Sequence, residues 1–162
     1  MTRFRSLAAL PVLVLTGLTL SQCGGKPKVQ AQDFSYSVAV SFTPAAIERM
    51  KTLGQKATVE AYYYGAPTQA EQSKVNEDGQ IDLGMDMNDI DATGQTVKLS
   101  GNGIDQTRLT SLSDGKPSVT VRVYSSATAG TPNQLACTTF SGTVEAARAA
   151  PVVITCDIAK AR

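Results

Sequence analysis

The sequence predicts a mainly β protein: a single β-sandwich of about seven short strands with one or two short helices. Beyond residue 33, apolar residues alternate with polar ones in most segments, which is the period of a half-buried strand. Turn signals such as Asn-Glu-Asp-Gly at 76–79 and Gly-Asn-Gly at 101–103 separate these runs. Because such alternation leaves each sheet with one buried face, we expect two sheets that pack face to face.

The first alternating run, residues 34–42, predicts a strand, and the signals of a short helix follow it. Thr43 is a typical N-cap residue, and Pro44 fits the first helical position. Gly54 can end the helix in a left-handed conformation. The residues that we expect on its apolar face, at helical spacing, are Ile47, Met50 and Leu53.

Residues 57–64 and 80–87 predict the second and third strands, which a polar stretch joins. A shorter run at 95–99, with Val97 and Leu99 as its apolar positions, predicts the fourth. Strict alternation in the third strand places four apolar residues on one face, and these are Ile81, Leu83, Met85 and Met87.

The last third of the chain predicts a helical turn and three further strands. Asp105 can cap a turn or two that ends near Leu112. The expected strands cover residues 118–124, 135–144 and 152–158, with a further helical turn at 145–150 between the last two.

Residues 57–83 contain a Tyr-rich strand, a turn and the run Gly-Gln-Ile-Asp-Leu, and this pattern resembles the hairpins of transthyretin-like and immunoglobulin-like sandwiches. The resemblance implies the same two-layer fold and no particular activity. Segments 57–67, 121–137 and 151–158 also look like parts of small, uncharacterised proteobacterial lipoproteins, and that likeness implies no activity either.

The N-terminus has the features of an export signal. Arg3 and Arg5 precede an apolar stretch at 7–20, which is shorter than the roughly 20 residues that a transmembrane helix needs. The following Leu-Ser-Gln-Cys at 20–23 resembles the lipobox of bacterial lipoproteins, with Gln22 where that family usually has Gly, Ala or Ser. The resemblance implies removal of residues 1–22 and acyl chains such as palmitate on Cys23.

Lipidation would tie the protein to a membrane through Cys23. The residue after this cysteine is not Asp, which for such lipoproteins implies sorting to the outer membrane on the side that faces the periplasm. Residues 23–32 then form a flexible tether and residues 33–162 the domain. The alternative is a plain secretory signal cleaved after Val-Gln-Ala at 29–31, which would release a soluble periplasmic or secreted protein.

The cysteine count agrees with export. The chain has three cysteines, and setting Cys23 aside leaves Cys137 and Cys156 as an even pair in strand-like segments. An oxidising compartment favours a disulfide between them. Two buried free thiols remain the alternative.

Composition excludes several function classes. Without Arg3 and Arg5, 13 basic residues face 14 acidic ones, so the surplus of positive charge that a nucleic-acid partner requires is missing. The chain has no His, which removes every His-dependent catalytic triad. It also lacks Gly-x-Ser-x-Gly and a Gly-rich phosphate loop. We therefore expect no cofactor and no enzymatic activity.

An acidic segment at 71–91 carries seven carboxylates against Lys74 alone. Clustered carboxylates are the ligands that Ca²⁺ prefers, and Asp86, Asp89 and Asp91 are the candidates. The run Asp-Ile-Asp-Ala-Thr-Gly at 89–94 starts like an EF-hand loop, but Ser100 stands where that loop needs Glu. A solvated acidic loop is the alternative.

The second candidate site is a run of three tyrosines at 62–64. Alternation puts Tyr63 in the core and places Tyr62 and Tyr64 together on the other face, where they would offer an aromatic platform to a sugar or a peptide. The alternative is that tyrosine simply favours strands and that another layer covers this face.

Three functional hypotheses follow. The first is a lipid-anchored, non-enzymatic binding or structural module with the membrane and an envelope protein as its partners. The second is a protein that binds Ca²⁺ or a small ligand through residues 71–91. The third is a secreted hydrolase that uses an unrecognised carboxylate site.

Overall fold

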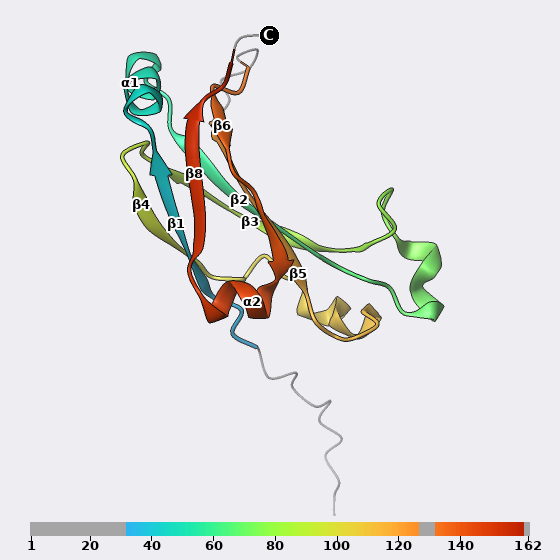
Figure 1. Cartoon of the computed structure of the whole chain (residues 1–162). Coiled ribbons are helices and arrows are strands. Elements are labelled where there is room, and N and C mark those ends of the chain that lie inside the picture. Colours follow the sequence, from blue (N-terminus) through green and yellow to red (C-terminus); the bar gives the residue numbers. More distant parts are fainter. Residues whose placement is uncertain (1–31, 127–131, 161–162) are drawn as a thin grey trace, which may run out of the picture. The chain divides into compact units, whose positions relative to one another are not determined.

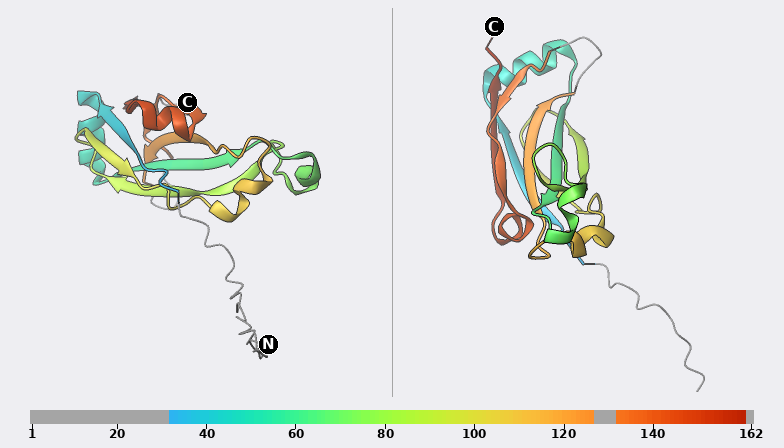
Figure 2. Two further views of the ribbon diagram at one scale, coloured as in Figure 1. Left: turned by 90° about the horizontal axis from the view of Figure 1, so that it is seen from below. Right: turned by 90° about the vertical axis from the view of Figure 1, so that its right-hand side faces the viewer.

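The computed structural model describes residues 32–126 and 132–160 and confirms the mainly β sandwich (Figure 1). The export segment, Cys23 and the tether up to residue 31 lie outside the described residues. Two four-stranded sheets form the two layers (Figure 2). Sheet A has the strand order β4 (Gln95–Leu99), β1 (Tyr36–Phe42), β8 (Val152–Ile158), β6 (Leu135–Cys137). Sheet B has the order β3 (Ile81–Ile90), β2 (Ala57–Gly65), β5 (Ser118–Ser125), β7 (Phe140–Thr143).

The inner faces of the two sheets form one core, as alternation predicts. β1 runs parallel to β8 and pairs Val40 with Ile154, whereas every other strand pair is antiparallel. The parallel pair brings the first and last strands together at the centre of sheet A. The largest fully buried side chains include Tyr63, Met50, Ile81, Leu83, Leu99 and Ile154.

The expectation of one strand at 135–144 is wrong, because the chain changes sheets within it. β6 pairs with β8 in sheet A, and β7 pairs with β5 in sheet B. Val144 already belongs to helix α2 (Val144–Ala149), which Thr143 caps by accepting a hydrogen bond from the backbone of Ala146. Alternation shows which residues face inward, but it does not show which sheet a strand joins.

The third strand departs from strict alternation. The pairing of β2 with β3 shifts between Tyr63 and Tyr64, so that Tyr63 faces Gly84 while Tyr64 faces Asp82. Leu83 is the additional residue, which makes this a β-bulge. Gly84 has φ 104° and lies against the carbonyl of Gly103, where a Cβ has no room.

The bulge reverses the strand's faces beyond Gly84. Ile81 and Leu83 are buried as expected, but Met85 and Met87 are 49% and 53% exposed. The expectation that all four apolar residues share one face is therefore wrong. An inserted residue shifts a period of two by one position and moves every later side chain to the other face.

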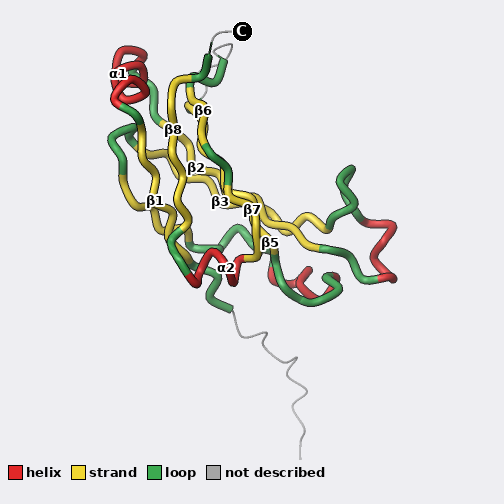
Figure 3. Tube along the Cα trace, viewed as in Figure 1, coloured by secondary structure: helices red, strands yellow, loops and turns green. Residues whose placement is uncertain are grey.

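Short helices lie at the ends of the sandwich (Figure 3). α1 (Pro44–Leu53) begins after Thr43, whose hydroxyl accepts from the backbone of Ala46, and Gly54 ends it with φ 62°. Its buried residues are Ala46 and Met50, whereas Leu53, expected on the apolar face, is 38% exposed. The 3₁₀ turns are η1 (Gln69–Lys74) and η2 (Gln106–Ser111), and Asp105 caps η2 as predicted.

No helix within residues 32–126 and 132–160 has the length and apolar character needed to cross a membrane.

The disulfide between Cys137 and Cys156 is confirmed. The two residues stand opposite each other in the antiparallel pair β6–β8, and Cys156 is buried. The bond therefore ties the edge strand β6 to the centre of sheet A. A cross-link that closes a loop of this length is expected to stabilise the fold by about 3 kcal/mol.

Candidate functional site

The outer face of sheet B carries four large side chains that no other layer of the described chain covers completely. Strand register places Tyr62 opposite Met85. Because β2 and β3 are antiparallel, Tyr64 lies two residues to one side of this pair and Met87 two residues to the other side. Both methionines are about half exposed, and both tyrosines are half-buried. We call Tyr62, Tyr64, Met85 and Met87 the tyrosine–methionine face.

Hydrogen bonds fix the two tyrosine rings. The Nδ2 of Asn76 donates to the Tyr62 hydroxyl at 3.1 Å, and the Thr120 hydroxyl donates to that of Tyr64 at 3.4 Å. The ring centroids are 5.7 Å apart with an interplanar angle of 24°. Because these hydrogen bonds already hold the rings, the protein loses little side-chain entropy when a partner docks on them, and this favours binding.

The Asn76 side chain is itself held by the turn before β3. Its Oδ1 accepts from the backbone nitrogens of Asp78, at 3.0 Å, and Gln80, at 2.9 Å. The turn that was identified in the sequence therefore positions the Tyr62 ring as well as reversing the chain.

A polar cluster lies on the same outer face, with Glu60 on β2 opposite Met87 and with Arg122 and Tyr124 on the neighbouring strand β5. Arg122 Nη2 lies 2.5 Å from Glu60 Oε1, and the Tyr124 hydroxyl donates to Glu60 Oε2 at 3.0 Å. Burial, followed by the hydrogen bond to Glu60, raises the pKa of Tyr124. Arg122, the cationic side chain nearest to these tyrosines, is therefore already paired with Glu60.

Beneath the face, Asp86 points inward and explains why the methionines point outward. Its Oδ2 accepts from the Tyr63 hydroxyl at 3.0 Å and from the Gly101 nitrogen at 2.8 Å, and its Oδ1 accepts from the Gly103 nitrogen at 2.8 Å. The Tyr63 hydroxyl also lies 3.3 Å from that of Tyr36 in sheet A. This network joins the two sheets, and it requires the reversed faces that the bulge provides.

The two buried tyrosines of this network stay protonated at neutral pH. Burial raises the pKa of Tyr36 to about 12, and it raises that of Tyr63 further, with help from the bond to Tyr36. A phenol that holds its proton this strongly acts as a hydrogen-bond donor. The cluster is therefore suited to a structural role and poorly suited to proton transfer near neutral pH.

The structure separates the three carboxylates that we selected as metal ligands. Asp86 binds backbone amides, as described above. Asp89 lies on the outer side of β3 and accepts from the hydroxyl of Thr58 at 2.7 Å, while Asp91 pairs with Lys56 at 3.6 Å. In the described parts of the chain, no three His, Cys, Asp or Glu side chains are placed to hold a metal ion.

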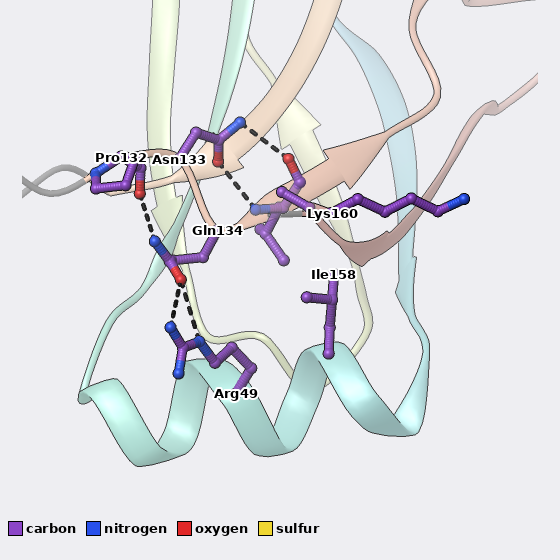
Figure 4. Close-up of a pocket in the computed structure, with 8 residues that line it drawn as sticks. Arg49, Pro132, Asn133, Gln134, Ile158 and Lys160 are labelled. Atoms are coloured by element: carbon purple, nitrogen blue, oxygen red, sulfur yellow. Dashed lines mark hydrogen bonds between the residues drawn. The ribbon is translucent and has the colours of Figure 1, made fainter. Parts of the chain in front are cut away.

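A cavity of about 960 Å³ lies between α1, the segment before β6 and the end of β8 (Figure 4). Arg49 Nε and Nη2 both donate to Gln134 Oε1, at 3.1 and 2.9 Å. The Gln134 Nε2 in turn donates to the Pro132 carbonyl at 2.6 Å. Among the described residues that line this cavity, none carries a carboxylate, hydroxyl or thiol group, so they offer no pairing of a nucleophile with an acidic residue.

Sequence reasoning identified the tyrosines of the face and missed the methionines. The signal that was available is Gly84, because a glycine inside a strand pattern often marks a bulge. No model of a protein family, curated protein or solved structure matches this chain. The site therefore has to be interpreted from its own geometry.

Proposed function

We propose that this protein is a lipid-anchored, non-enzymatic binding module of the cell envelope that holds a partner on its tyrosine–methionine face. The observation that carries the proposal is the exposure of Met85 and Met87 beside two anchored tyrosine rings. Exposed clusters of large apolar side chains are typical of interaction surfaces. Tyrosine and methionine are also enriched where proteins bind one another.

The energetic argument concerns apolar area. Each square ångström of apolar surface that a partner removes from water contributes about 25 cal/mol. The thioethers of Met85 and Met87 are flexible enough to fit an irregular partner surface, whereas the tyrosines are held in place. A rigid aromatic part beside an adaptable one favours a protein or peptide partner.

Anchoring at Cys23 would keep the start of the domain close to the membrane. Gln32, where the described chain begins, is nine residues after Cys23, and an extended chain spans at most about 3.6 Å per residue. The start of the domain would then stay within about 30 Å of the bilayer. Such a tether raises the effective concentration for partners at the same surface.

Replacement of Cys23 tests the anchor. In Cys23→Ser, the protein should move from the membrane pellet to the soluble fraction, and intact mass should show no acyl groups. The wild-type protein should carry them and remain in the pellet. If the wild type has an unmodified mature N-terminus, the lipid anchor is ruled out.

Site-specific photo-crosslinking in intact envelopes tests the binding face. A crosslinker at Met87 should give a discrete adduct that Tyr62→Ser abolishes. A crosslinker at Val153, which is 67% exposed on the outer face of sheet A, serves as the matched control. Equal adducts at both positions, or none at Met87, would remove the support for this face.

A further inference from the structure

Carboxylates lie on and beside the tyrosine–methionine face. Asp82 pairs across the strands with Tyr64, and Asp89 lies two residues beyond Met87 on β3. Two exposed acidic residues, Glu77 and Asp78, belong to the turn that holds Asn76. The carboxylates on or beside this face are therefore Glu60, Glu77, Asp78, Asp82 and Asp89.

Positive charge does not balance them. The outward positions of β2, β3, β5 and β7 in the described chain contain one cationic residue, Arg122, which already pairs with Glu60. The nearby Lys74 of η1 pairs with Glu71, and Lys56 pairs with Asp91. The five carboxylates and Arg122 leave a net charge of −4 around an apolar centre.

We propose that the partner is a cationic, apolar peptide segment, in which arginine or lysine lies beside large apolar residues on the same side of the peptide. This inference rests on the proposed function of the same face and adds the partner's chemistry. Cationic side chains can lie over the Tyr62 and Tyr64 rings and pair with Asp82 and the carboxylates of the adjacent turn. The apolar residues of the peptide would pack on Met85 and Met87.

Charge also distinguishes this partner from two other classes. Anionic lipid headgroups and acidic proteins are repelled by the net −4 border, because like charges brought together cost free energy. A neutral sugar can stack on the tyrosines but gains nothing from the carboxylate border. A cationic segment alone uses both the apolar centre and the charges around it.

Fluorescence anisotropy with labelled peptides tests the inference on the full chain in uncharged detergent. The probe is a peptide of Arg-Arg-Leu-Leu repeats, which presents both residue types on each side when extended, compared with the same peptide carrying Glu in place of Arg and with a neutral oligosaccharide. We expect the Arg peptide to bind at least about tenfold more tightly than the Glu peptide. Its affinity should fall as salt rises, because screening shortens the range of the border charges.

Two sets of variants locate the binding. Asp78→Asn combined with Asp82→Asn should weaken the Arg peptide about tenfold and reduce its salt dependence. The control is Asp114→Asn, because Asp114 lies in another turn and, like Asp82, accepts from the backbone nitrogen two residues ahead. Asparagine retains that acceptor in both variants, so thermal melting should be unchanged.

The outcomes separate this inference from the proposed function. If the Glu peptide or the oligosaccharide binds as well as the Arg peptide, and Met85→Ser with Met87→Ser abolishes that binding, the face binds a partner of another class. The inference is also overturned if the Arg peptide binds the wild type and the Asp78→Asn, Asp82→Asn variant equally well. If a crosslinker at Met87 gives no adduct in intact envelopes, by contrast, the proposed function itself is ruled out.

Discussion

The two sheets of this sandwich both contribute to one apolar core and differ in the side chains of their outer faces. Sheet A turns small or polar residues outward on its central strands, such as Ser37, Ala39, Ser41 and Thr155, with Val153 as its one large exposed apolar residue there. Sheet B turns outward three tyrosines and two methionines, which are Tyr62, Tyr64, Tyr124, Met85 and Met87.

Alternation specifies the core of both sheets and leaves their outer faces free to vary. A face of serine and threonine is well solvated and needs no partner. A face with tyrosine and methionine keeps apolar area in water and gains free energy when that area is covered. The two outer faces of the same fold thus differ in how much apolar side-chain area they leave in water.

The sheets also differ in what holds their edges. In sheet A, the disulfide fastens the edge strand β6 to β8. In sheet B, the edge strand β3 is held through Asp86, which accepts hydrogen bonds from the loop after β4 and from Tyr63. One edge depends on a covalent bond and the other on a polar network.

The largest expected effect comes from removing the carboxylate of the sheet B edge. Asp86→Ala leaves the Gly101 and Gly103 amides and the Tyr63 hydroxyl without an acceptor, which should lower the free energy of unfolding by roughly 3 kcal/mol or more. Chemical denaturation measures the loss. The control Asp91→Ala breaks an exposed ion pair with Lys56 and should cost less than about 0.5 kcal/mol. Similar small losses in both variants would show that Asp86 does not hold this edge.

The matching change in sheet A should come close in size. Cys137→Ala with Cys156→Ala removes the cross-link, and we expect a loss of about 3 kcal/mol in the free energy of unfolding. A reducing agent should lower the stability of the wild type and leave the double variant unaffected. A wild type that is indifferent to reduction would mean that the bond contributes nothing to this edge.

The tyrosine network that joins the sheets should make stability fall at alkaline pH. The folded-state pKa of Tyr36 is raised to about 12 from an unfolded value near 10. The stabilisation is fully present below about pH 10, and it is lost as the pH rises toward about 12, because the unfolded chain releases protons first. The loss is about 1.4 kcal/mol per pH unit for each such tyrosine.

Denaturation at a series of alkaline pH values measures this slope. Tyr36→Phe removes one of the two titrating groups and should make the slope shallower between about pH 10 and about pH 12. A slope identical to that of the wild type would mean that Tyr36 does not contribute to the alkaline response.

Substitutions on the outer faces should have the smallest effect on stability, and they should distinguish the two faces by peptide binding. Met85→Ser with Met87→Ser on sheet B, and Val153→Ser on sheet A, should each change stability by less than about 0.5 kcal/mol per site. Only the methionine variant should lose the peptide binding. A large loss of stability in the methionine variant would show that these side chains support the fold more than they bind a partner.

Much of the fold could be predicted because its signals are local. Thr43 and Gly54 mark the ends of α1, and Asp105 marks the start of η2, through hydrogen bonds or backbone angles within a few residues. The alternation of β2 was sufficient to place Tyr62 and Tyr64 outward. The disulfide was predictable because only Cys137 and Cys156 remain once Cys23 is set aside.

The methionines could not be placed in the same way. Their direction depends on a bulge, and the bulge is stabilised by contacts with Gly101 and Gly103, which are distant in sequence. Asp86 lies apart from Asp89 and Asp91 for the same reason. The bulge turns the Asp86 side chain inward, where it accepts hydrogen bonds from Gly101 and Gly103. The division of 135–144 between two sheets also depends on pairing with β8 and β5.

By itself, the sequence determined the two-layer β class, the helix caps, the cysteine pair and the tyrosines of the candidate face, because each follows from a short-range rule of spacing or hydrogen bonding. The tertiary structure alone decided which sheet each late strand joined and which way Met85, Asp86 and Met87 pointed. Strand pairing and side-chain direction depend on the free energy of hydrogen-bonding buried polar groups across the whole domain. The hydrogen-bond partners of those groups are distant in sequence, so a short stretch of neighbouring residues does not contain them.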